Sequence, residues 1–207
     1  MTAPKTTKSI ESRMLAAIRK RGRGSVFVPV DFLAIGSREA VDVTLHRLAR
    51  KGIIRRLARG LYDFPKEHPI FGILSPSAVV VAQTLAGRDC TRLQPTGAYA
   101  ANILGLSEQV PAKIIFLTDG PSRTVKIGPM TIQLRHTTAR NMAAAGRLSG
   151  LLIQALRYLG IEYVTPKRRE HLRRSIPASQ RRELIKDIRF APAWMHPIFR
   201  DLGRDET

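Results

Sequence analysis

The chain has 207 residues, of which 35 are Lys or Arg and 16 are Asp or Glu, so its formal net charge is +19. This length allows one large domain or two small ones, and a hydrophobic fraction of 43% is enough for a packed core. The excess of positive charge exceeds what solubility requires and predicts attraction to polyanions such as nucleic acids. No apolar run approaches the ~20 residues that a membrane-spanning helix needs.

The sequence predicts a cytoplasmic protein without a membrane partner. Its single cysteine, Cys90, has no second cysteine for an internal disulfide, and we expect it to be a small buried apolar residue. Residues 1–8 are polar and no apolar stretch of the signal-peptide type follows them.

The first elements alternate helix and strand. Ser9 is a suitable N-cap for a helix that ends before Gly22. A strand-like segment, Ser25–Val28, precedes a second helix that starts at Pro29 and includes Phe32, Leu33 and Ile35. Gly36 can close that helix and Ser37 can cap the next one, which predicts a tight turn between two helices.

A third helix is expected from Arg38 to Lys51, with Val41, Leu45 and Leu48 as its inward stripe. Two strands follow, Ile53–Ala58 and Leu61–Phe64, joined by a turn at Arg59-Gly60. The order helix, strand, helix, turn, helix, hairpin is that of a winged helix-turn-helix. We therefore predict a DNA-binding domain over residues 1–67.

The third helix and the hairpin carry the candidate DNA contacts. An arginine on the helix can make a bidentate bond to guanine, and hydroxyl or hairpin groups can contact phosphates; the alternative is a solvated helix face. Strand alternation places Arg55 and Arg56 on opposite faces, so only one of them can face DNA. The predicted contacts are Ser37, Arg38, Asp42, Thr44, His46, Arg47, Arg56 and Arg59.

Residues 68–207 are predicted to form a second, mixed α/β domain with a helical C-terminus, which makes the whole chain α+β. The expected helices are Ala78–Ala86, Thr96–Leu104 and Ala139–Leu159, and the expected strands are Ala112–Thr118, Thr124–Ile127 and Met130–Arg135. A basic tail, Lys167–Arg189, should form two short helices split by Pro177. Trp194 and Phe199 beyond it either close the core of this domain or anchor a partner.

No pattern of residues indicates catalysis. The five histidines do not stand at zinc-ligand spacing from cysteine or carboxylate, and neither HExxH nor CxxC occurs. Acidic residues are scarce and scattered, so no carboxylate pair for two-metal chemistry is visible. We therefore predict no enzyme activity, no metal site and no cofactor.

Several segments together resemble the AbiEi-type antitoxins. The run from Gly36 to Tyr62, which includes KGIIRRLARGLY, resembles their N-terminal domain. QPTGAYAANILGLS (Gln94–Ser107), then VPAK (Val110–Lys113) and LTDGPSR (Leu117–Arg123), are similar to the second domain of one branch. The second-domain segments are the more specific, since many winged helices share the first pattern. The resemblance covers about Ser9 to Leu159.

The resemblance implies an antitoxin of an AbiE (type IV) toxin–antitoxin system. It implies a winged helix that binds operator DNA, usually inverted repeats, and represses its own operon, with a dimer possible on DNA. It also implies a C-terminal domain that counters a nucleotidyltransferase-like toxin. The alternatives are a stand-alone DNA-binding transcriptional regulator and an RNA-associated factor.

Overall fold

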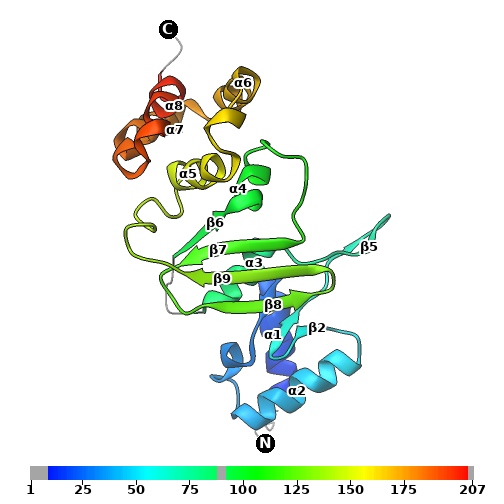
Figure 1. Ribbon diagram of the computed structural model, residues 1–207. Helices are drawn as coiled ribbons and strands as arrows, with labels where there is room; N and C mark the ends of the chain where they lie inside the picture. The colour runs from blue at the N-terminus through cyan, green and yellow to red at the C-terminus, as the bar shows by residue number, and fades with distance from the viewer. Residues whose placement is uncertain (1–8, 88–91, 205–207) are drawn as a thin grey trace, which may run out of the picture. The chain divides into compact units, whose positions relative to one another are not determined.

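The computed structural model describes residues 9–87 and 92–204, and Cys90 lies outside them. It is mixed α/β and divides into two compact units between Thr84 and Leu85; Figure 1 colours the first blue to green-cyan and the second green to red. The boundary was predicted after residue 67, whereas the structure groups residues 68–84 with the first unit. No helix in the described residues is long and apolar enough to cross a membrane.

The first unit begins with α1 (Ile10–Arg21), whose N-cap Ser9 accepts a hydrogen bond from the Ser12 backbone N–H. It ends at Gly22, where φ is 83°. β1 (Val26–Phe27) follows. The helix expected from Pro29 through Ile35 is only a 3₁₀ turn, η1 (Pro29–Phe32), because so few residues separate the proline from the next helix.

The next elements match the prediction closely. α2 (Arg38–Arg50) starts at the N-cap Ser37, and β2 (Arg55–Ala58) and β3 (Leu61–Asp63) form the hairpin. The three strands make an antiparallel sheet of order β1-β3-β2. The core between helices and sheet contains Met14, Ile18, Phe27, Phe32, Val41, Leu45, Leu48, Ile54 and Tyr62.

A second hairpin in this unit was not predicted. It consists of β4 (Glu67–His68) and β5 (Gly72–Ile73) and forms a narrow projection (Figure 1). Its tip is apolar and exposed, with Ile70 81% and Phe71 75% accessible. The ring Nδ1 of His68 accepts hydrogen bonds from the backbone N–H groups of both tip residues, which fixes the turn. Helix α3 (Ala78–Ala86) follows, as predicted.

The second unit contains a four-stranded sheet of order β6-β7-β9-β8. Its central strands β7 and β9 are parallel, and the two outer pairs are antiparallel. The strands are β6 (Leu93–Thr96), β7 (Lys113–Thr118), β8 (Arg123–Ile127) and β9 (Met130–His136). Only β6 was missed by the sequence, because Pro95 within it argues against a strand; its position at the sheet edge accommodates the proline.

Helices form the rest of the second unit, and α5 lies between the sheet and the C-terminal helices (Figure 1). They are α4 (Gly97–Ile103), α5 (Leu148–Leu159), η2 (Ile161–Tyr163), α6 (Pro166–Ser175), α7 (Ala178–Asp187), η3 (Ile188–Phe190), η4 (Ala193–Met195) and α8 (His196–Leu202). Their shared core includes Leu172, Leu184 and Phe199, with Trp194 packed against it. The C-terminal aromatic residues therefore close the core of their own unit, and the split at Pro177 is as predicted.

The long helix predicted over Ala139–Leu159 is wrong in its first half. Residues 139–147 form turns, and the helix starts only at Leu148. Gly146 has φ 77°, a left-handed conformation that ends a helical run. The alanines before it have high helix propensity, but the local backbone hydrogen bonds are those of short turns, such as Ala145 N–H to Met142 C=O.

Candidate nucleic-acid interface

The position of α2 is fixed by its buried side. Val41, Leu45 and Leu48 are fully buried in the same core cluster as Met14 and Ile18 of α1. At 3.6 residues per turn, this stripe leaves the opposite side of α2 free. The packing therefore determines which side chains α2 can present to a ligand.

The exposed side of α2 carries two arginines and a histidine. His46, Arg47 and Arg50 are exposed together with Glu39 and the apolar Val43, which is 48% accessible. We call these five residues the α2 outer face. Arginine and histidine can donate to base edges or phosphates, and an apolar side chain can contact a thymine methyl group. The face thus combines the side-chain chemistry of groove contacts with one negative charge.

Three of these residues, Glu39, Val43 and Arg50, are not among the contacts predicted from the sequence. Val43 lies four residues after Glu39 and four before Arg47, and Arg50 lies four after His46, so all of them share one face of the helix. The helical period alone would have indicated these residues, because positions three and four apart lie on the same face.

Arg38 and Asp42 bind each other. Arg38 Nε donates to Asp42 Oδ2 at 2.8 Å, one helical turn apart, and the two side chains are 57% and 47% exposed. Such exposed pairs stabilise by only about 0.3–0.5 kcal/mol, so a phosphate can displace the carboxylate. In the free protein Asp42 nevertheless offsets the charge of Arg38.

Ser37 and Thr44 have structural partners. The Ser37 hydroxyl caps α2 by accepting from the Ala40 N–H. Thr44 is 6% exposed and its hydroxyl donates to the Ala40 carbonyl at 2.7 Å. The phosphate contact predicted for the Thr44 hydroxyl therefore does not fit the structure, because this side chain is on the buried side of α2.

The β2–β3 hairpin separates its arginines. Arg55 donates to Asp63 and to the Leu74 carbonyl, whereas Arg56 and Arg59 are exposed. The tight turn follows from Gly60, whose φ is 69°. The structure therefore assigns opposite environments to Arg55 and Arg56, as strand alternation predicts.

A groove between the start of α1 and α2 carries acidic residues. It is lined by Glu11, Glu39, Val43 and Arg47, with a volume of about 460 Å³. Glu11 also accepts from Lys51 Nζ at 2.5 Å. These carboxylates disfavour phosphate on the flank beside Arg47, and the arginine of the α2 outer face that lies outside this groove is Arg50.

In the second unit, the basic tail Lys167–Arg189 is partly structural. Arg173 pairs with Glu170 and Asp201, and Arg181 donates to backbone carbonyls. Arg169 and Arg182 are exposed. The tail thus both holds its helices together and presents positive charge to solvent.

The Asp119-Gly120 turn of the second unit is held by an ion pair. Arg92 Nε donates to Asp119 Oδ2 at 2.9 Å, and the Arg92 backbone N–H donates to Oδ1. The hydrogen bond from the Arg92 side chain lowers the pKa of Asp119 below its usual value. Elsewhere in this unit, Tyr99 of α4 packs edge-on against Phe116 of β7. Burial raises the pKa of the Tyr99 hydroxyl. Both are structural arrangements.

Among the described residues, no group of three or more His, Cys, Asp or Glu side chains is placed to hold a metal ion.

Comparisons with known proteins give a family and a distant structural likeness. No curated protein matches the chain. Among solved structures, it is similar to the crystal structure of the RV2827C protein from Mycobacterium tuberculosis, at 17% sequence identity and a TM-score of 0.47, over 99% of this chain and 85% of that chain. A family model described as a family of unknown function, DUF6088, matches residues 13–184. The chain therefore belongs to the DUF6088 family.

Proposed function

We propose that this protein is a DNA-binding transcriptional regulator whose first unit is a winged helix-turn-helix. The observation that carries the proposal is the pairing of α2 with the β2–β3 hairpin: one helix with a buried stripe and a cationic outer face, followed by a tight hairpin that exposes Arg56 and Arg59. In helix-turn-helix domains the second of the two helices, which here is α2 after η1, enters the major groove.

The order of elements supports this assignment. α1, β1, η1, α2, β2 and β3 follow one another, and the three strands form the antiparallel sheet β1-β3-β2. His46, Arg47 and Arg50 would contact the groove, and Arg56 and Arg59 the neighbouring phosphates. The net charge of +19 supplies the sequence-independent part of the affinity.

We further propose that the protein acts as an antitoxin of an AbiE-like system, in the cytoplasm and without catalysis of its own. The second unit has its own core and carries the segments that resemble AbiEi-type antitoxins. It would counter a nucleotidyltransferase-like toxin, while the first unit represses the operon by binding inverted repeats as a dimer. The separate core is what allows the two activities to be tested apart.

The DNA-binding proposal is tested by fluorescence anisotropy with a duplex from the region upstream of the gene and a scrambled duplex. Arg47→Gln should weaken specific binding by about 1–3 kcal/mol, the range for a bidentate base contact, which is about 5- to 150-fold. Arg47→Lys should keep the affinity for scrambled DNA and lose the preference for the upstream sequence, because lysine lacks the planar fork.

Glu39→Gln is a control variant that is expected to change DNA affinity in the opposite direction. It removes the negative charge from the α2 outer face and should strengthen binding to both duplexes. The proposal would be contradicted if Arg47→Gln bound the upstream duplex with unchanged affinity. It would also be contradicted if the native protein bound single-stranded RNA as tightly as the upstream duplex.

The antitoxin proposal is tested with the full-length double variant Arg47→Gln/Arg59→Gln. This variant should no longer repress a promoter fusion, yet it should still restore growth of cells that express the nucleotidyltransferase-like protein encoded beside it. Failure of the native chain to restore growth would reject the antitoxin role and leave DNA binding untouched.

A further inference from the structure

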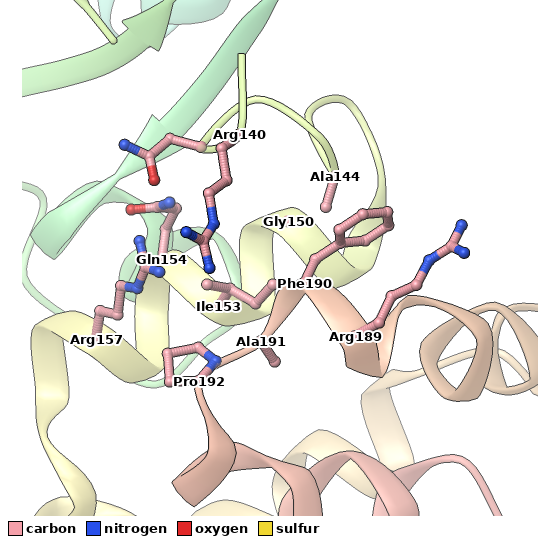
Figure 2. Close-up of a pocket in the computed structure, with 11 residues that line it drawn as sticks. Arg140, Ala144, Gly150, Ile153, Gln154, Arg157, Arg189, Phe190, Ala191 and Pro192 are labelled. Atoms are coloured by element: carbon pink, nitrogen blue, oxygen red, sulfur yellow. The ribbon is translucent and has the colours of Figure 1, made fainter. Parts of the chain in front are cut away.

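The second unit contains a cavity that the proposed function does not use. It has a volume of about 380 Å³ and lies between the turns of residues 139–147, α5, and the segment that follows α7. Figure 2 shows the residues that line it. The ones that matter for its chemistry are Arg140, Gln154 and Arg157, with Ile153 and Pro192 as apolar wall.

The polar ends of three side chains converge there. Figure 2 shows Arg140, Gln154 and Arg157 with their head groups pointing toward one another, while Arg189 points away. No carboxylate of the described residues forms an ion pair with Arg140 or Arg157, and none lines the cavity. Both arginines are exposed, so solvent screens part of their mutual repulsion, and an anion between the two guanidinium groups would reduce what remains.

Gln154 is built into the cavity wall. Only 6% of the residue is exposed. Its Oε1 accepts a hydrogen bond from Thr96 Oγ1 at 2.8 Å, which fixes the amide plane. The two donors of Nε2 then remain for a ligand, and no hydrogen bond within the described residues engages them. A buried amide that offers only donors beside two guanidinium groups selects for an acceptor with several oxygens.

The close packing around α5 makes the cavity a formed feature of the fold. A Cβ atom placed on Gly150 would lie 2.2 Å from the Ala144 carbonyl oxygen and 2.5 Å from Gln94 Oε1, so only glycine allows the turn segment to approach the helix here. Gln94 Oε1 is itself buried without a hydrogen-bond partner. The segment that carries Arg140 is thereby held against α5.

We propose that this cavity binds the phosphate group of a small phosphomonoester. Guanidinium groups match phosphate oxygens through planar, charge-assisted hydrogen bonds, and the amide of Gln154 adds neutral donors. The volume lies at the lower end of small-molecule sites, about 300–1,000 Å³, so it suits a ligand of mononucleotide size. Ile153 and Pro192 would contact the apolar part of that ligand.

This site goes beyond DNA binding and toxin neutralisation. It would make the second unit a receptor for a phosphorylated metabolite, and it does not depend on the first unit being a winged helix. DNA binding and ligand binding can therefore fail independently.

The test is isothermal titration calorimetry of the full-length protein with inorganic phosphate, AMP and adenosine at constant ionic strength. Phosphate and AMP should bind saturably with one site, AMP more tightly, and adenosine should not bind. Absence of saturable binding by both phosphate and AMP would overturn the proposal. Saturable phosphate binding without tighter AMP binding would restrict the ligand to free phosphate and overturn the phosphomonoester assignment.

Variants separate the cavity from the general positive charge. Arg157→Gln and Gln154→Glu should each weaken AMP binding about tenfold or more, the latter because it keeps the bond from Thr96 and adds a negative charge. Arg182→Gln removes an exposed arginine on α7 outside the cavity and should change AMP affinity less than twofold. Equal losses in Arg157→Gln and Arg182→Gln would show nonspecific attraction and overturn the proposal.

Circular dichroism melting curves check that each variant is folded. If Gln154→Glu does not fold, Arg140→Gln, whose side chain is exposed, replaces it with the same expected loss. If Arg157→Gln lost binding to the scrambled DNA duplex while its AMP binding stayed unchanged, the arginines of the cavity would contact nucleic acid. That outcome would also reject the cavity as a phosphomonoester site.

Discussion

Arg55 and Asp63 lie directly opposite each other on β2 and β3 and are joined by two hydrogen bonds, at 3.1 and 2.6 Å. Asp63 is 1% exposed, whereas the Arg55 side chain is 34% exposed. The same guanidinium group reaches the Leu74 carbonyl at 3.0 Å. This pair therefore ties the hairpin to the segment before α3, and Arg55 belongs to the fold of the first unit and not to its outer surface.

We expect Arg55→Met to destabilise the protein by about 3 kcal/mol, because it leaves a buried carboxylate without its partner. Arg56→Met, at the next and exposed position, should change the free energy of unfolding by less than about 0.5 kcal/mol and should weaken DNA binding. Urea denaturation followed by circular dichroism measures the first effect, and fluorescence anisotropy the second. Similar stabilities for the two variants would contradict this division of roles.

Arg59 at the tip of the β2–β3 hairpin should act as a phosphate contact. Arg59→Gln is expected to lower the slope of log Kd against log salt concentration by about 0.9, the value for one phosphate contact on B-DNA. The loss should be the same for specific and scrambled duplexes. Titrations at several salt concentrations measure the slope, and a sequence-dependent loss would mean that Arg59 contacts a base.

A buried charge in the second unit predicts another stability effect. Asp187, 3% exposed, accepts from Arg147 Nη1 at 2.9 Å and from the Ser149 hydroxyl. Arg147→Met should cost about 3 kcal/mol, because Ser149 alone cannot compensate a buried carboxylate. Arg182→Met on the same helix as Asp187 is the control, with an expected change below about 0.5 kcal/mol. Thermal and urea unfolding would show the difference, and equal midpoints would refute it.

The Arg92–Asp119 pair predicts a pH dependence. Because Arg92 lowers the pKa of Asp119 in the folded state, the pair stabilises the protein above the unfolded-state pKa of about 3.9. That stability is lost as the pH falls through the lowered folded-state pKa. Asp119→Asn should therefore be less stable than the native protein at pH 7, by no more than about 1 kcal/mol for so exposed a pair.

The difference between Asp119→Asn and the native protein should shrink as the pH falls below about 4. Urea denaturation of both proteins at pH 7 and at pH 3 measures it. A difference that grows on acidification would mean that the pKa of Asp119 is raised, against the hydrogen bonds from Arg92.

Local signals predicted the elements that have strong local causes. Ser37 as a cap and the apolar spacing of Val41, Leu45 and Leu48 give α2 to within one residue at its end. Ala78–Ala86 is found with the predicted bounds. In each case the residues that define the element are neighbours in the sequence, so their pattern contains the necessary information.

The failures have long-range or backbone causes. The alanine-rich start of the helix predicted over residues 139–159 is not helical in the structure, and Gly146 there has a left-handed conformation. The presence of a glycine in the sequence does not reveal its φ. Burial of Thr44 depends on packing against other elements, and convergence of Arg140 with Arg157 depends on the turn held against Gly150. Such contacts join residues through the tertiary fold, which spacing alone does not determine.

The β4–β5 projection has a practical consequence for handling the protein. At low salt the net charge of +19 keeps copies apart, although Ile70 and Phe71 are open to solvent. Raising the salt to 1 M to strip nucleic acid shortens the Debye length from about 10 Å to about 3 Å, and the mutual repulsion of the copies disappears with it. Purification in high salt should therefore promote aggregation through these exposed hairpin tips. The double variant Ile70→Ser/Phe71→Ser should stay monodisperse under the same conditions.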